Sequence, residues 1–136
     1  MKKQRLILYR AKRYPDGEWV YGLPRYDTVE DGAITAFETL DGKIHFIDID
    51  TLGEYTGLTD KRDELIYEGD IVKIDDKYLR YVAYSGEHTA FCAMHYIDKQ
   101  QSELTGTLGD GYDNYKRSYE VVGNIYDNHE ILEVPF

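Results

Sequence analysis

Residues 65–74 read Leu65-Ile66-Tyr67-Glu68-Gly69-Asp70-Ile71-Val72-Lys73-Ile74, and this stretch contains the strongest fold signal in the chain. The β-branched residues after Asp70 predict a strand. Gly69 suits a position where the backbone kinks or passes close to another segment. The Asp70 carboxylate can accept hydrogen bonds from nearby backbone amides. The stretch therefore predicts a strand that begins at a Gly-Asp step and starts a small β-domain.

Downstream, short strands alternate with turns. Asp75-Asp76 and Ser85-Gly86-Glu87 are turn sequences. The predicted strands span residues 65–74, 78–84, 89–96 and 118–126. Residues 98–117 are polar and glycine-containing, so we predict an inserted loop there. The whole predicts a C-terminal region, residues 57–136, built as an SH3-like small barrel and closed by a short helix or tail at 128–134.

Upstream, the pattern predicts two β-hairpins in an N-terminal region, residues 1–56. The first turns at Pro15-Asp16-Gly17 and the second at Leu40-Asp41-Gly42, and both contain the Asp-Gly step that tight turns favour. Their strands span residues 6–14, 18–23, 33–39 and 43–50, with an acidic loop at 26–32 and a new segment from 50. No helical periodicity appears. The predicted fold is mainly β (β-rich α+β): N-terminal hairpins packed with a C-terminal barrel, little helix, and compatible with packing as one unit.

One strand of the second hairpin has apolar residues on both faces. Ile44 and Phe46 point one way, and Ile47 and Ile49 point the other, because successive strand side chains alternate. We therefore expect this strand to be covered at least partly on both sides.

Charge is distributed unevenly over the 136 residues. The net charge is −10, yet the first 13 residues hold six bases and no acid, which leaves ten bases against 26 acids and a net charge of −16 in the rest. The six bases are candidate nucleic-acid contacts: Lys2, Lys3, Arg5, Arg10, Lys12 and Arg13. We favour solvated strand flanks for them, because the acidic body would repel a phosphate backbone.

The sequence offers no motif for catalysis, metal or cofactor binding. The four histidines form no metal-ligand spacing, and the single cysteine, Cys92, lies in an apolar stretch typical of a buried thiol. The glycines near 106–111 lack a phosphate-loop sequence, and the serines lack a nucleophile context. We expect no cofactor and no metal, and we do not favour an enzyme.

Three blocks resemble the YopX family of phage and prophage proteins. They are Glu18-Trp19-Val20-Tyr21-Gly22, residues 53–72, and Val122-Gly123-Asn124-Ile125-Tyr126-Asp127-Asn128. Arg62-Asp63-Glu64 and His129 depart from the family pattern. The motif residues, expected to be structural, are Trp19, Tyr55, Gly57, Tyr67, Glu68, Gly69, Asp70, Gly123 and Asn124. The resemblance implies a phage or prophage gene and a β-rich fold, acting in the bacterial host cytoplasm, with no assigned active residue.

Tyrosine is abundant, at 14 residues, and suits both half-buried sheet faces and interfaces. We therefore favour a non-enzymatic accessory protein that binds an unknown host or phage protein and forms a homo-oligomer. The alternatives are nucleic-acid association through the basic end, an acidic body that imitates DNA, and a small hydrolase. No stretch reaches the length of a membrane span, so no membrane role is expected and the cytoplasm is the expected location.

Overall fold

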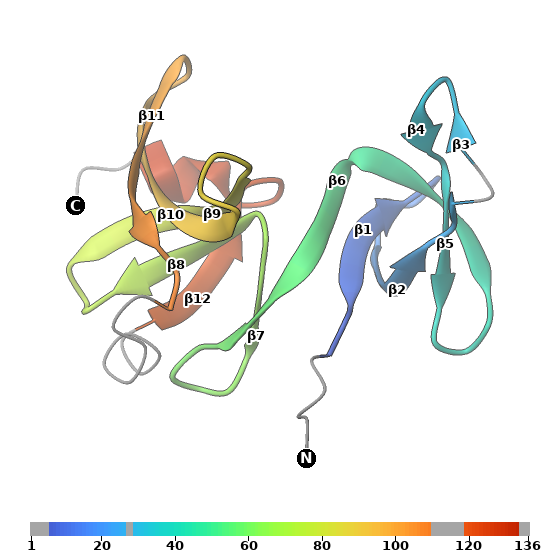
Figure 1. The fold of residues 1–136 in the computed structure, drawn as a ribbon, viewed down its shortest axis with the longest axis horizontal. Coiled ribbons are helices and arrows are strands. Elements are labelled where there is room, and N and C mark those ends of the chain that lie inside the picture. Colours follow the sequence, from blue (N-terminus) through green and yellow to red (C-terminus); the bar gives the residue numbers. More distant parts are fainter. Residues whose placement is uncertain (1–5, 27–28, 110–118, 134–136) are drawn as a thin grey trace. The chain divides into compact units, whose positions relative to one another are not determined.

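The computed structural model describes residues 6–26, 29–109 and 119–133, which form a mainly β structure with two five-stranded antiparallel sheets (Figure 1). The predicted fold class is confirmed. The chain divides into two compact units, Met1–Tyr55 and Thr56–Phe136, and each is described by itself.

The N-terminal unit contains a closed ring of four strands. They are β1 (Tyr9–Arg13), β2 (Trp19–Pro24), β5 (Ala36–Thr39) and the first part of β6 (Ile44–Thr59). Each strand pairs with the next, and β6 also pairs with β1. The two predicted hairpins are therefore present, and pairing of β1 with β6 joins them into a ring without free edges.

A small satellite hairpin interrupts the path from β2 to β5. It consists of β3 (Val29–Glu30) and β4 (Ala33–Ile34), which pair antiparallel. The prediction of a loop over 26–32 is wrong for β3. The predicted strand 33–39 is also divided, because β4 pairs with β3 whereas β5 pairs with β2.

Strand β6 is longer than predicted and bends instead of ending near residue 50. Its pairing with β1 skips residues: Arg10 lies opposite Gly53, but Lys12 lies opposite Asp48. Within this bulge the Thr51 hydroxyl accepts a hydrogen bond from the Lys12 N–H at 2.8 Å and donates to the Asp48 carbonyl at 2.7 Å. Because a bulge increases local bending, β6 can close the ring and still continue to Thr59.

The ring surrounds a small core of Ala11, Val20, Phe37 and Ile47, on which Tyr9 and Leu52 also pack. Phe37 is the largest of the four buried side chains and is fully buried. A four-stranded ring has little interior volume, so one aromatic ring and three smaller side chains suffice to fill it.

In the C-terminal unit, the end of β6 is followed by β7 (Leu65–Tyr67) and a second sheet. That sheet has the order β11-β10-β9-β8-β12. Its strands are β8 (Asp70–Ile74), β9 (Tyr78–Ser85), β10 (Ala90–Asp98), β11 (Gln101–Thr107) and β12 (Tyr119–Asn124), and a 3-10 helix, η2 (His129–Glu133), follows. The SH3-like closure of this region stays a prediction.

The predicted inserted loop at 98–117 is wrong for its first part. Residues Gln101–Thr107 form β11, which pairs with β10 through a tight turn after Asp98. Residues 110–117 of the predicted loop lie outside the described residues. The strand escaped prediction because its residues are polar: it lies at the end of the sheet and exposes most of its side chains.

The core of the C-terminal unit lies on one face of this sheet. It is formed by Ile66, Val72, Val82 and Tyr119, with partly buried neighbours such as Phe91. On the other face η2 packs against β10. Cys92 is fully buried, as predicted, and burial raises the pKa of its thiol, which disfavours a reactive thiolate.

Candidate binding surfaces

The Gly-Asp motif forms a turn whose polar groups are satisfied internally. The buried Asp70 carboxylate accepts a hydrogen bond from the Tyr67 N–H at 2.8 Å. Gly69 donates from its N–H to the Val82 carbonyl at 2.8 Å and accepts from the Ile125 N–H at 2.9 Å. These bonds tie the turn to β9 and to the segment after β12.

Gly69 occupies this turn for two reasons. Its φ is +92°, and a Cβ there would lie 3.0 Å from Cε2 of Tyr126. An L-residue would therefore be strained in its backbone and crowded by the tyrosine ring. The geometry assigns this part of the motif to folding, since each polar atom named above is engaged within the unit.

The closing motif, residues 123–128, is a second internally bonded turn. The Asn124 side chain accepts from the N–H groups of Tyr126 at 3.0 Å and Asp127 at 2.9 Å, and the Asn128 side chain accepts from the Asn124 N–H at 3.1 Å. A Cβ at Gly123 would lie 2.7 Å from Oδ1 of Asn128, so the backbone must come close here. This turn fixes the start of η2 at His129.

A buried carboxylate that sequence reasoning missed organises the turn between β6 and β7. Asp60 is 2% exposed; its Oδ1 accepts from the N–H groups of Arg62 at 2.8 Å and Glu64 at 3.0 Å. Its Oδ2 accepts from the Val121 N–H at 2.9 Å, and the Lys61 N–H donates to the Tyr119 carbonyl at 2.9 Å. The turn therefore lies along β12. In the sequence, Asp60 is one acid in a charged run, and composition does not distinguish it.

Of the other motif residues, all but Glu68 lie on strands. The Tyr55 N–H donates to the Leu8 carbonyl at 2.8 Å. Gly57 has a φ of +91° within β6, and Glu68 lies in the turn between β7 and β8. Trp19 on β2 is contacted by two of the basic residues.

Three of the six basic candidates are described, and each has a partner in its own unit. The Arg10 guanidinium, on a residue only 7% exposed, lies 4.7 Å from the centroid of the Trp19 ring, and Lys12 Nζ lies 5.5 Å from it. Arg13 donates three hydrogen bonds from Nε and Nη2 to the Asp16 carboxylate, the shortest at 2.7 Å. These bonds lower the pKa of the Asp16 carboxyl to about 2 and raise the pKa of Arg13. Lys2, Lys3 and Arg5 lie outside the described residues.

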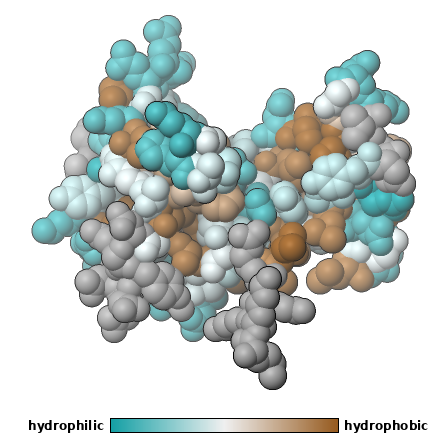
Figure 2. Space-filling model, viewed as in Figure 1, coloured by the Kyte–Doolittle hydropathy of each residue, from teal (hydrophilic) through white to brown (hydrophobic). Residues whose placement is uncertain are grey.

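The outside of the N-terminal ring carries exposed apolar side chains on β2 and β6, the two strands that flank β5. Leu23 on β2 lies opposite Glu38 on β5, which lies opposite Ile44 on β6, and directly paired residues share one side of a sheet. Tyr21 and Phe46 follow on the same side by alternation. Their exposed fractions are 45% for Tyr21, 48% for Leu23, 48% for Ile44 and 69% for Phe46. We call these four residues the outer apolar face; apolar surface gathers over this unit in Figure 2.

This face corrects one expectation. The sequence predicted a β6 strand covered on both sides, but only the Ile47 side packs into the ring, whereas Ile44 and Phe46 are open to solvent. Ring closure explains the difference, because a closed ring has one inside and the remaining side chains must point outward.

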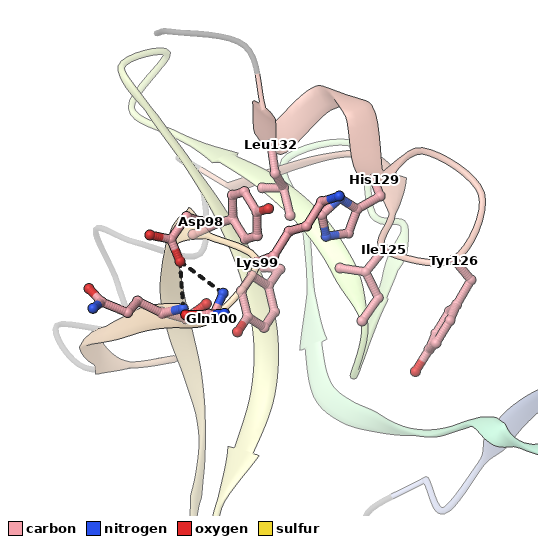
Figure 3. Close-up of a pocket in the computed structure, with 11 residues that line it drawn as sticks. Asp98, Lys99, Gln100, Ile125, Tyr126, His129 and Leu132 are labelled. Carbon is pink, nitrogen blue, oxygen red and sulfur yellow. Dashed lines mark hydrogen bonds between the residues drawn. The ribbon is translucent and has the colours of Figure 1, made fainter.

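The C-terminal unit has a pocket of about 490 Å³ beside η2 (Figure 3). Tyr81 on β9 and Tyr96 on β10 line it; Tyr81 lies opposite Met94, so the two tyrosines are diagonal neighbours on one face. Leu132 of η2 is among the apolar residues that line it, and the His129 ring meets Tyr96 edge-to-face at a centroid distance of 4.9 Å. We call this the Tyr81–Tyr96 pocket.

One rim of the pocket is the turn between β10 and β11. Asp98 accepts hydrogen bonds there from the N–H groups of Gln100 at 2.8 Å and Gln101 at 2.9 Å (dashed in Figure 3). Burial raises the pKa of Tyr96 first, and the nearby charges of Glu133 and Asp98 raise it further. The carboxylates therefore make the electrostatic potential around the Tyr96 hydroxyl negative.

The described residues offer little for catalysis. Ser85 Oγ lies 2.9 Å from Nδ1 of His88, but both are exposed in one turn, and the Ser85 hydroxyl also accepts from the His88 N–H at 3.3 Å. Such a contact is ordinary for a serine turn. Within the part of the chain that the structure describes, no three His, Cys, Asp or Glu side chains gather as metal ligands, and no helix is long and apolar enough to cross a membrane.

The structure is that of a mainly β protein in which internally hydrogen-bonded turns join short antiparallel strands. The chain belongs to the YopX family: the family model described as YopX protein matches residues 8–133. A solved structure, the crystal structure of protein EF1440 from Enterococcus faecalis, is similar with a TM-score of 0.51 and 21% sequence identity, over 95% of this chain and 99% of that chain. At this identity the likeness shows the fold alone. No curated protein sequence matches the chain.

Proposed function

We propose that this protein is a phage- or prophage-encoded accessory protein that acts by binding protein and associates with itself through the outer apolar face. One observation carries the proposal: Tyr21, Leu23, Ile44 and Phe46 are all 45% exposed or more and project outward from β2 and β6, the two strands that flank β5. Monomeric proteins rarely leave such apolar groups gathered in water, and gathered groups mark interaction sites.

The ring makes this face suitable for docking. Its backbone is closed by hydrogen bonds, so the strands cannot turn these side chains inward without breaking pairing. Fully burying a large apolar side chain stabilises an association by about 1.5–3 kcal/mol. A twofold pairing of two copies would bring each patch onto its own counterpart, which is the commonest arrangement in homo-oligomers.

Size-exclusion chromatography with light scattering, over a concentration series, tests the proposal. We expect the wild-type protein to exceed its monomer mass of 15.9 kDa as concentration rises, and Phe46→Glu to remain monomeric. Leu40→Glu is the matched control, because Leu40 is 89% exposed but lies in the turn between β5 and β6, outside the face. A wild-type protein that stays monomeric throughout, or a Leu40→Glu variant that dissociates equally, would contradict the proposed face.

A further inference from the structure

We propose that the Tyr81–Tyr96 pocket binds the cationic end of an arginine or lysine side chain presented by a partner polypeptide. This surface is different from the outer apolar face, and the proposal stands or fails independently of self-association.

The pocket has room for one long side chain. Its volume of about 490 Å³ falls within the range of sites that enclose small ligands. Ile125 and Leu132 provide apolar contacts that suit the methylene stem of a basic side chain. The rings of Tyr81 and Tyr96 line the pocket, and the face of an aromatic ring attracts a cation placed over it.

Two carboxylates, Asp98 and Glu133, lie near Tyr96 and favour a cation at that end of the pocket. Asp98 is fixed at the rim because its Oδ1 atom accepts hydrogen bonds from two backbone N–H groups, and its second oxygen can accept from a ligand. Glu133 of η2 lies 3.7 Å from Nδ1 of His129, which is itself a lining residue. The chain as a whole carries a net charge of −10, which attracts basic partners over a longer range.

Lys99 also lines the pocket, and it sharpens the argument. Its side chain crosses the pocket in the direction of His129 (Figure 3). The pocket therefore already holds an ammonium group from the chain itself, which a ligand cation would have to displace. If the pocket recognises cations, Lys99 competes with the ligand, and its removal should strengthen binding; if the pocket recognises carboxylates, Lys99 is the anchor, and its removal should weaken binding.

The test is an NMR titration of the full 15N-labelled chain with three blocked tripeptides, Gly-Arg-Gly, Gly-citrulline-Gly and Gly-Glu-Gly. We expect the arginine peptide to shift the amide signals around Tyr81, Tyr96 and Gln100 in a saturable way. Citrulline has the same shape without the charge, so its peptide should bind at least about fivefold more weakly. Tighter binding of the glutamate peptide, or equal binding of citrulline, would overturn the proposal.

Four variants make the result specific. Tyr96→Leu should weaken the arginine peptide about fivefold, whereas Tyr96→Phe, which keeps the ring, should change it less than twofold. Asp98→Asn keeps an oxygen to accept from Gln100 and Gln101 but removes the charge, so affinity should fall a few-fold. Lys99→Gln should raise affinity a few-fold; a fall would overturn the proposal. The same spectra report whether each variant is folded, and Phe46→Glu should leave the titration unchanged.

Discussion

The two units deal with the edges of a β-sheet in different ways. The N-terminal unit has no free edge among its four main strands, because β6 pairs with β1 and closes the ring. The C-terminal sheet has β12 and β11 at its ends: the Asp60 turn lies along β12, and β11 carries a bulge beside Thr105 and exposed polar residues such as Glu103. Both are known protections against edge pairing.

This difference shows which unit needs polar side chains to protect its sheet edges and which unit can carry apolar side chains on its outside. Ring closure uses mainly backbone hydrogen bonds, so the outside of the N-terminal ring can carry apolar side chains. Guarding an open sheet requires side chains in defined places, and the buried carboxylates of Asp60 and Asp70 both lie in the C-terminal unit. Much of the family motif lies around them for that reason.

The largest expected effect tests whether the units are independent. Phe37→Ala should destabilise the N-terminal ring by about 4 kcal/mol, because it empties most of a small core. Hydrogen exchange should then accelerate in β1, β2 and β5 while β8–β10 keep their protection. Val82→Ala is the mirror variant and should affect the C-terminal sheet. Equal loss of protection in both units after Phe37→Ala would mean that they unfold as one.

Disrupting the Asp60 turn, which lies along the edge strand β12, should destabilise the protein nearly as much. Asp60→Ala leaves the N–H groups of Arg62, Glu64 and Val121 without their acceptor and should lower the free energy of unfolding by about 3 kcal/mol. Urea denaturation measures this loss, and hydrogen exchange at Val121 should show its location. Glu64→Ala, on an exposed side chain of the same turn, should change stability by no more than about 0.5 kcal/mol. Comparable losses for both variants would show that the Asp60 bonds do not hold the turn.

Gly69→Ala should have a smaller but clear effect. Its backbone has a φ of +92° and its Cβ would meet the Tyr126 ring, so we expect a loss of about 1–2 kcal/mol in thermal or urea unfolding. Gly86→Ala is the control, because a Cβ there meets nothing within 4 Å. A neutral Gly69→Ala would show that the turn has another conformation in solution.

The smallest effect belongs to the first turn of the N-terminal unit. The folded pKa of Asp16, about 2, lies below its ordinary value of 3.8, so ionised Asp16 stabilises the folded state at neutral pH and this contribution disappears as pH falls from about 4 to 2. The group is exposed, so the effect should be slight. Asp16→Asn should lower the melting temperature slightly at pH 7 and not at pH 2; Arg13→Gln should do the same. An unchanged difference at both pH values would contradict this ion pair.

Local signals predicted the hairpins well. The Asp-Gly turns at residues 16–17 and 41–42 and the Gly-Asp step at 69–70 all mark real chain reversals or strand starts, because turn chemistry depends on a few neighbouring residues. Ring closure escaped prediction because it depends on pairing between β1 and β6, which lie far apart in the sequence. The sequence instead predicted that a barrel would form in the C-terminal region.

The candidate surfaces were harder to predict than the fold. The sequence showed that the first 13 residues are basic. It could not show that Arg10 lies against Trp19 or that Arg13 binds Asp16. Tyr81 and Tyr96 become neighbours only through the register of β9 and β10. The alternating apolar residues of β6 suggested burial on both sides, and only the closed ring shows which side is left in solvent.

Ring closure also has a consequence for how quickly the protein reaches its folded state. A β-hairpin forms within about 1–10 μs. Pairing between strands that are far apart in the sequence is slower, because a long loop must be ordered before its contacts form. The ring closes only when Tyr9 and Arg10 meet Glu54 and Gly53, so β1, which is synthesised first among the strands of the ring, waits for β6, which is synthesised last among them. Until then β1 and β6 are open edges, and the nascent chain is most exposed to mispairing during this interval.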